Sequence, residues 1–126
     1  MKRKFLLWGL GFGIVAILLG AFGAHGLKSI LNEAQLDSFE TGVRYQLYHA
    51  FFLLFIGTQK NLQSKVVLNL TVIGVFLFSF SIYMLNFREY LTMDFLKFLG
   101  PVTPIGGLLL IAAWSLLFVK VFKQKS

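Results

Sequence analysis

Few side chains in this sequence could take part in chemistry, and they fall at two places. His25 ends one apolar run, and the stretch from Glu40 to His49 opens another with a carboxylate, an arginine and a second histidine. A histidine can transfer protons or ligate a metal, and an arginine can hold a phosphate. The chain has no cysteine, which excludes thiol catalysis and Cys-type zinc sites. Neither a Ser-His-Asp pattern nor a P-loop or dinucleotide motif is present, so we predict no catalytic residue.

Each of these groups has a functional and a structural interpretation. Glu40 and Arg44 are four residues apart with the acid first, the favourable order for a salt bridge on a helix. The pair either neutralises an arginine near the membrane or presents Arg44 as a phosphate clamp. His49 lies more than one turn deeper and is either a functional group or a satisfied histidine bonded to a neighbouring helix. A site made of His25, His49 and Glu40 lacks the spacing of metal ligands, so no metal and no cofactor are predicted.

The elements that must position these residues are four apolar runs. They cover 5–24, 41–58, 66–85 and 103–119. Each is about long enough to cross a ~30 Å hydrocarbon core as a helix. The chain is 57% hydrophobic and only 13% charged, too little polar surface for a soluble domain.

A shorter segment lies between the first two runs. Its apolar residues Leu27, Ile30, Leu31 and Ala34 recur at helical spacing opposite polar ones, which predicts an amphipathic helix at the membrane interface. The expected fold is therefore all-α: an integral membrane four-helix bundle, with a short amphipathic interfacial helix between spans 1 and 2. Residues 1–126 form one membrane domain.

Charge is distributed differently on alternate connections. All five acidic residues lie between runs one and two or between runs three and four. The N-terminus, the middle connection and the C-terminus carry only basic residues, namely Lys2, Arg3, Lys4, Lys60, Lys65, Lys120, Lys123 and Lys125. Basic residues accumulate on the cytoplasmic side, so we expect both termini in the cytoplasm and a multi-pass protein of the plasma membrane. The net charge of +7 then reflects contact with anionic lipid and not with nucleic acid.

In this topology the unusual polar residues gather toward the outer leaflet. The expected cluster, a candidate ligand-binding site, comprises His25, Glu40, Arg44, Tyr45, Gln46, His49, Tyr83 and Thr103. Thr103 and Pro104 have the pattern of an N-cap followed by proline at the first helical position. Gly106 and Gly107 would then either bare the first turn for an anionic headgroup or allow close helix packing.

Small residues recur along the first run. Gly9, Gly13, Gly20 and Gly23 follow one another at three- to seven-residue intervals, a stripe that lets another helix approach closely. A signal peptide with cleavage after Gly23 is the alternative for this run, and the packing stripe favours a retained span.

Three blocks of the sequence resemble one known family. They are Gly20-Ala21-Phe22-Gly23-Ala24-His25-Gly26-Leu27, then Tyr45-Gln46-Leu47-Tyr48-His49-Ala50, then Thr103-Pro104-Ile105-Gly106-Gly107 with Trp114. In order and spacing they resemble the small membrane proteins of domain of unknown function 423, to which the animal transmembrane protein 256 is similar. The resemblance implies four membrane spans and supplies no catalytic residue.

Three functional hypotheses follow from these observations. The first is a non-catalytic binding or accessory protein that contacts membrane lipids and a membrane-protein partner or a second copy of itself. The second is a small transporter or channel subunit. The third is an enzyme that acts on a lipid headgroup, with His49 or His25 as base and Arg44 as phosphate clamp. A sealed bundle would favour the accessory protein, and an axial pore would favour the transporter or channel subunit. A lateral groove at Arg44 would favour the lipid enzyme.

Overall fold

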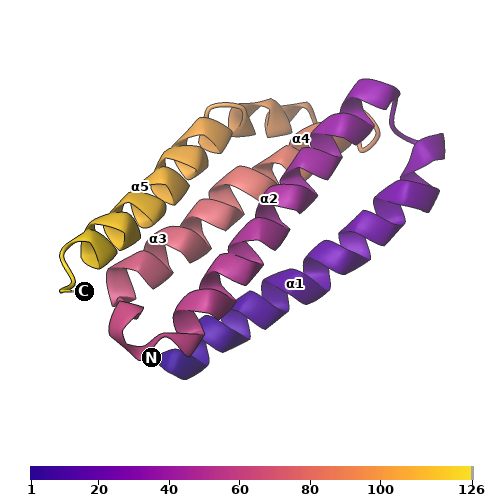
Figure 1. Ribbon diagram of the computed structural model, residues 1–126. Helices are drawn as coiled ribbons and strands as arrows, with labels where there is room; N and C mark the ends of the chain where they lie inside the picture. The colour runs from indigo at the N-terminus through magenta and orange to yellow at the C-terminus, as the bar shows by residue number, and fades with distance from the viewer. Residues whose placement is uncertain (126) are drawn as a thin grey trace.

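The computed structural model describes residues 1–125 and folds them entirely into helices and their connections (Figure 1). The α-helices are α1 (Lys2–His25), α2 (Glu33–Thr58), α3 (Lys65–Val75), α4 (Ser81–Phe87) and α5 (Val102–Phe122). A π-helical segment, Phe76–Phe80, joins α3 to α4 without a break in the rod. Short 3-10 helices at Gly26–Ser29, Lys60–Leu62 and Asp94–Leu99 lie in the connections.

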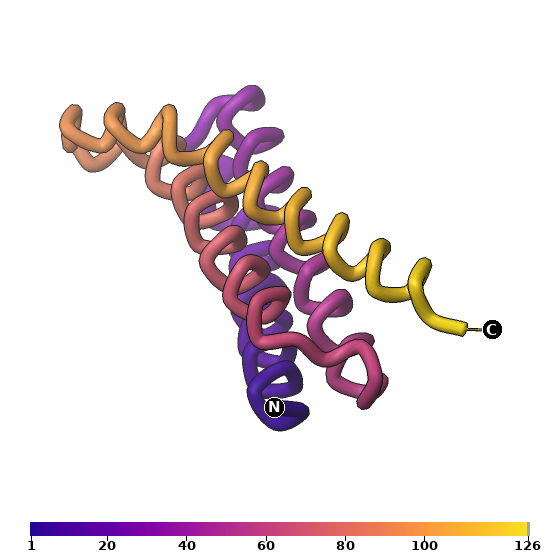
Figure 2. Tube along the Cα trace, turned by 90° about the vertical axis from the view of Figure 1, so that its left-hand side faces the viewer, coloured from indigo at the N-terminus to yellow at the C-terminus, as the bar shows by residue number. Residues whose placement is uncertain are grey.

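The four rods run alternately up and down. Figure 1 shows α5, α3, α2 and α1 side by side in that order, with α2 between α1 and α3. Both ends of the described chain lie at the same end of the bundle as the connection from α2 to α3 (Figure 1). The closest pairings are α1 with α2 and α3 with α5. Figure 2 shows α5 diverging from the other helices toward its C-terminal end.

The core receives side chains from all four rods. Its fully enclosed members include Phe5 of α1, Leu53 and Ile56 of α2, Val75 of α3 and Ala113 of α5. The outward faces remain apolar: Ile14, Ile17, Leu108 and Phe118, among others, are exposed. An all-round apolar helix is buried in a large protein or lies in a membrane, and this bundle is too small to bury these faces itself.

Three segments have the length and composition to cross a membrane: Lys2–Ser29, Lys65–Phe87 and Asp94–Phe122. Helix α2 does not meet the same criterion, because its first turns carry charges and its interior holds Gln46 and His49. Those two polar side chains are buried against the neighbouring helices. Helix α2 is thus the least hydrophobic of the long helices, and the neighbouring helices cover these polar groups.

The segment between α1 and α2 differs from the interfacial helix predicted over 27–39. Only a 3-10 turn, Gly26–Ser29, stands apart, and the residues from Glu33 onward form the first turns of α2. The reason is local, since Asn32 caps α2. Its side chain accepts from the Gln35 N–H at 2.8 Å, and Gln35 Oε1 accepts from the Asn32 N–H at 2.9 Å. Leu27, buried with Tyr83, finds a protein partner in place of lipid.

The start of α5 also differs from the prediction. Pro101, and not Thr103, occupies the N-cap position, and no side chain caps the helix. Thr103 is inside the first turn, where its hydroxyl forms a 2.5 Å hydrogen bond with Ser81 Oγ. The Thr103 hydroxyl therefore bonds to another helix and does not cap its own helix, contrary to the prediction. The π-helical segment beside it, Phe76–Phe80, had no signal in the sequence.

The glycines expected at helix contacts fall into two groups. A Cβ on Gly9 would stand 2.8 Å from Leu54 Cγ and one on Gly23 3.2 Å from Phe39, so α1 and α2 meet closely at both. A Cβ on Gly106 would lie 2.6 Å from the Leu77 carbonyl carbon, inside the backbone of the neighbouring rod. Gly13, Gly20 and Gly107 have room for a side chain, with nearest atoms 3.5 Å away or more.

Candidate functional site

The residues expected in one outer cluster are divided by the structure among separate environments. Gln46 and Tyr83 are buried between helices, whereas Glu40 and Arg44 face outward. His49 and Tyr45 line a groove toward α5, and Thr103 bonds to Ser81. His25, exposed at the end of α1, contributes to no metal site: within residues 1–125, no three His, Cys, Asp or Glu side chains lie close enough to hold an ion.

The buried group is a hydrogen-bonded link among three rods. Gln46 has no exposed surface. Its Nε2 donates to the Phe12 carbonyl of α1 at 2.9 Å, and its Oε1 accepts from the Tyr83 hydroxyl of α4 at 2.7 Å. One turn away, Ser79 Oγ donates to the Gly42 carbonyl at 2.8 Å. Both ends of the amide are thus used structurally, and none of the described buried side-chain polar atoms lacks a partner.

Gly42 makes this link possible. A Cβ at position 42 would lie 2.6 Å from the Tyr83 ring, so only glycine lets the ring pass α2 and reach Gln46. Phe39 packs against the same ring, with centroids 5.0 Å apart. Polar residues and a small residue on one face of α2 therefore serve to join helices.

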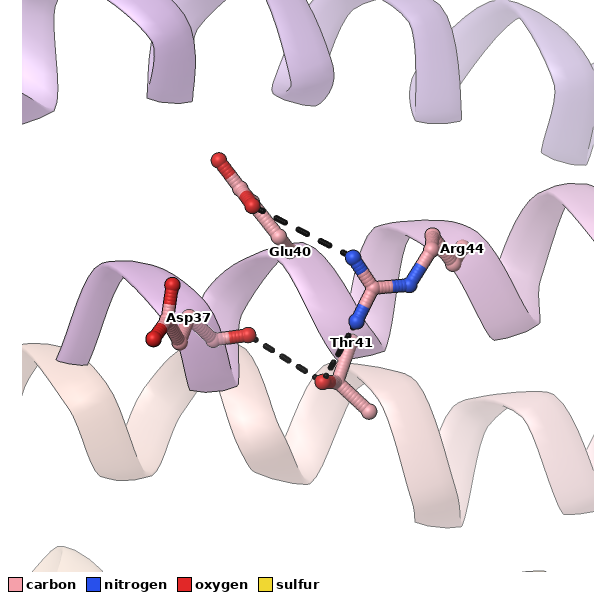
Figure 3. Close-up of polar contacts among 4 residues, drawn as sticks. All are labelled: Asp37, Glu40, Thr41 and Arg44. Atoms are coloured by element: carbon pink, nitrogen blue, oxygen red, sulfur yellow. Dashed lines mark hydrogen bonds and ion pairs between the residues drawn. The ribbon is translucent and has the colours of Figure 1, made fainter. Parts of the chain in front are cut away.

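The charged group lies on the outside of α2. Arg44 Nη1 is 4.0 Å from Glu40 Oε2, with about half of each side chain exposed. Arg44 Nη2 donates to Thr41 Oγ1 at 3.1 Å, and Thr41 Oγ1 donates to the Asp37 carbonyl at 3.1 Å (Figure 3). The arginine is held near its own helix by these contacts and lines a shallow hollow of about 270 Å³ beside Gly20 and Gly23 of α1.

Removing the charge of Glu40 should change stability little. An exposed ion pair contributes roughly 0–1 kcal/mol, and Arg44 keeps its bond to Thr41. We expect Glu40→Gln to lower the melting temperature in detergent slightly. Arg44→Ala combined with Glu40→Gln should be no worse than either single change. A double variant less stable than the sum of the singles would show that each residue has another partner.

His49 has both ring nitrogens engaged. The Trp114 indole N–H of α5 donates to His49 Nε2 at 2.9 Å, and His49 Nδ1 lies 2.6 Å from the Tyr45 carbonyl. Because an indole N–H can only donate, Nε2 must accept and the proton must sit on Nδ1. The ring is therefore a neutral histidine that fastens α5 to α2. Trp114 also stacks on Phe52, with centroids 4.4 Å apart.

An open groove runs between α2 and α5. It has a volume of about 420 Å³ and is lined by Tyr45, His49, Phe78, Gly107, Leu110, Ile111, Trp114 and Ser115. Phe78 comes from the π-helical segment, and its ring centroid lies 5.1 Å from that of Tyr45. No sequence pattern placed Ser115 or Phe78 at a site. In the sequence, Trp114 stood out only through the family resemblance, and Gly107 only as a candidate for helix packing or headgroup binding.

The two candidate groups of the lipid-enzyme hypothesis do not meet. Arg44 lines the hollow between α1 and α2, whereas His49 lines the groove between α2 and α5. His49 has no free nitrogen with which to take a proton from a substrate in this arrangement. Arg44 and His49 therefore do not converge on one reacting atom.

Fold and surface together define the class of protein, an all-α integral membrane bundle. Its few buried polar side chains join one helix to another. The comparisons with known proteins give the family. Residues 19–107 match the model described as Protein of unknown function (DUF423), and the chain belongs to this family.

Curated relatives extend the match beyond that region. The chain is 37% identical over 125 residues to a UPF0382 membrane protein of Staphylococcus haemolyticus, covering 96% of this chain and 97% of the relative. It is 34% identical over 121 residues to UPF0382 membrane proteins of two Staphylococcus aureus strains, bovine RF122 and USA300, with the same shares covered. No solved structure matches the chain.

Proposed function

We propose that this protein is a non-catalytic accessory protein of the plasma membrane, with four spans and both termini in the cytoplasm. It binds a transmembrane helix of a membrane-protein partner in the groove between α2 and α5. The observation that carries the proposal is this lateral groove of about 420 Å³, open on the lipid-facing side of the bundle. Helix association in a membrane depends on such shape complementarity, because lipid supplies little hydrophobic drive between helices.

The chemistry of the groove favours a helix over an acyl chain. Tyr45 and Ser115 line it, and within the described residues neither hydroxyl makes a hydrogen bond. A hydroxyl in hydrocarbon is costly without a partner. A neighbouring helix can offer carbonyls or polar side chains, whereas an acyl chain offers none. Interhelical bonds of this kind contribute roughly 0.6–2 kcal/mol each.

The interior of the bundle supports a non-catalytic role. Gln46, Tyr83, Ser79 and His49 each form a hydrogen bond with another helix of the same chain. The core between the rods is filled by apolar side chains. These contacts hold the bundle together and leave the groove as the site where a partner can be recognised.

Photo-crosslinking in living cells tests the partner. Benzoyl-phenylalanine at Ile111 lines the groove, and at Ile14 it faces lipid on α1, with near-equal exposures of 62% and 61%. We expect a discrete protein adduct from position 111 and none from position 14. The adduct should weaken when Tyr45→Phe and Ser115→Ala remove the hydroxyls. An adduct of twice the chain mass would assign the groove to a second copy, and a lipid adduct alone would contradict the proposal.

The topology has a separate test, helped by the absence of native cysteine. Gln124→Cys, beyond α5, should resist a membrane-impermeant thiol reagent in intact cells. Ser29→Cys, exposed in the connection from α1 to α2, should react. The expected pattern follows from the basic residues at the end that carries both termini. Labelling at 124 from outside would reverse the orientation, and labelling at both positions would exclude an even number of spans.

A further inference from the structure

A second hollow lies where α1 and α3 begin, at the end of the bundle that carries both termini. It has a volume of about 450 Å³ and is lined by Met1, Lys4, Trp8, Lys65, Leu68 and Asn69. Figure 2 shows the starts of α1 and α3 at this same end. The residues come from two rods that are distant in sequence, so the site exists only in the folded bundle.

The hollow combines uncompensated positive charge with an interfacial aromatic residue. Lys4 and Lys65 both line it and both are exposed. All five acidic side chains of the chain lie toward the opposite end, three in the first turns of α2 and two between α4 and α5, and the one ion pair among residues 1–125 is Glu40 with Arg44. Two ammonium groups around one hollow repel each other unless an anion lies between them.

The remaining lining fits a phospholipid and not a soluble anion. Trp8, 40% exposed, packs on Phe12 and Phe76 and places its ring beside the apolar outer faces of the rods. Tryptophan at this level is typical of the membrane–water interface. Asn69 adds an amide donor on the α3 side. Charge at the rim and apolar surface below match a headgroup phosphate with its acyl chains.

We propose that this hollow binds the phosphate of an anionic phospholipid, with Lys4 and Lys65 as the charged contacts, Asn69 as a hydrogen-bond donor and Trp8 beside the glycerol region. Basic hollows between membrane helices are known to bind acidic headgroups, and each basic residue near the surface contributes a factor of about five in affinity. The site is separate from the groove between α2 and α5, and it requires neither a protein partner nor a particular orientation of the chain.

Native mass spectrometry of the purified protein tests the site. Phosphatidylglycerol and phosphatidylcholine are titrated in turn into the full chain in neutral detergent. We expect tighter binding of phosphatidylglycerol, and Lys4→Gln with Lys65→Gln should weaken it by about 25-fold, as the loss of two such contacts implies. The matched control is Lys123→Gln with Lys125→Gln, which removes the same charge at the same end but outside the hollow.

Three results would overturn the proposal. Equal affinity for the two lipids in the unmodified protein would show that the headgroup charge does not contribute to binding. An equal loss in the control variant would show diffuse attraction to the whole basic end. Complete displacement of phosphatidylglycerol by millimolar inorganic phosphate would show that the hollow binds a free anion. Helicity by circular dichroism should be unchanged in both double variants, because all four lysines are exposed.

Discussion

Replacing Gly106 by alanine should destabilise the bundle by about 3 kcal/mol. The added Cβ would lie 2.6 Å from the Leu77 carbonyl carbon and 2.9 Å from Leu77 Cβ. Most of the obstruction is backbone of the π-helical segment, which cannot turn aside as a flexible side chain can. Overpacking of a well-filled contact typically costs 1–3 kcal/mol, and a backbone clash belongs at the upper end. Thermal or SDS unfolding in detergent would measure the loss.

Gly107 provides the matched control on the same turn. A Cβ there would be 3.5 Å from the Phe78 ring, an ordinary contact. Gly107→Ala should therefore be neutral, or stabilising by up to about 1 kcal/mol because alanine favours the helix. If the two variants proved equally stable, α5 would not meet the rod of α3 and α4 as closely as the structure shows. Gly106→Ala should also change the width of the groove between α2 and α5, because the added Cβ displaces α5.

Replacing Gln46 by leucine should cost about 3 kcal/mol. The substitution leaves the Tyr83 hydroxyl without an acceptor and removes the donor to the Phe12 carbonyl, in a place with no exposed surface. A buried polar group left unsatisfied costs roughly 1–3 kcal/mol. In a membrane no water is at hand to replace the lost partner. Unfolding in detergent should show a large loss for this single change.

A double variant separates the hydrogen bond from simple packing. Tyr83→Phe with Gln46→Leu removes both partners, so the pair should be less unstable than the sum of the singles by about 1 kcal/mol. Gln63→Leu is the control: Gln63 Nε2 donates to the Gly57 carbonyl at 3.1 Å in a connection that water can reach. It should cost well under 1 kcal/mol. Strict additivity at positions 46 and 83 would show that the two side chains do not interact.

The two proposed binding sites lie at different parts of the molecule. The proposed partner-helix site is the groove between α2 and α5. The proposed phospholipid site is the basic hollow where α1 and α3 begin. Failure of one proposal leaves the other standing, since they share no residue.

The sequence by itself determined the elements and their chemistry-bearing residues. Hydrophobic runs of spanning length predicted an all-α fold of four rods, and the structure has this fold. These features depend on local periodicity and on charge, which the order of residues records directly.

Tertiary structure alone decided what those residues contact. Gln46 and Tyr83 are 37 positions apart, and His49 and Trp114 are 65 apart, so no local pattern could pair them. The single outer cluster expected from topology is divided because helix rotation sends neighbouring polar residues to different partners. The groove and the basic hollow are spaces between rods, set by how closely glycines such as Gly9 and Gly106 let them approach. Packing distances of this kind depend on all the side chains at a contact together, and a one-dimensional pattern does not contain them.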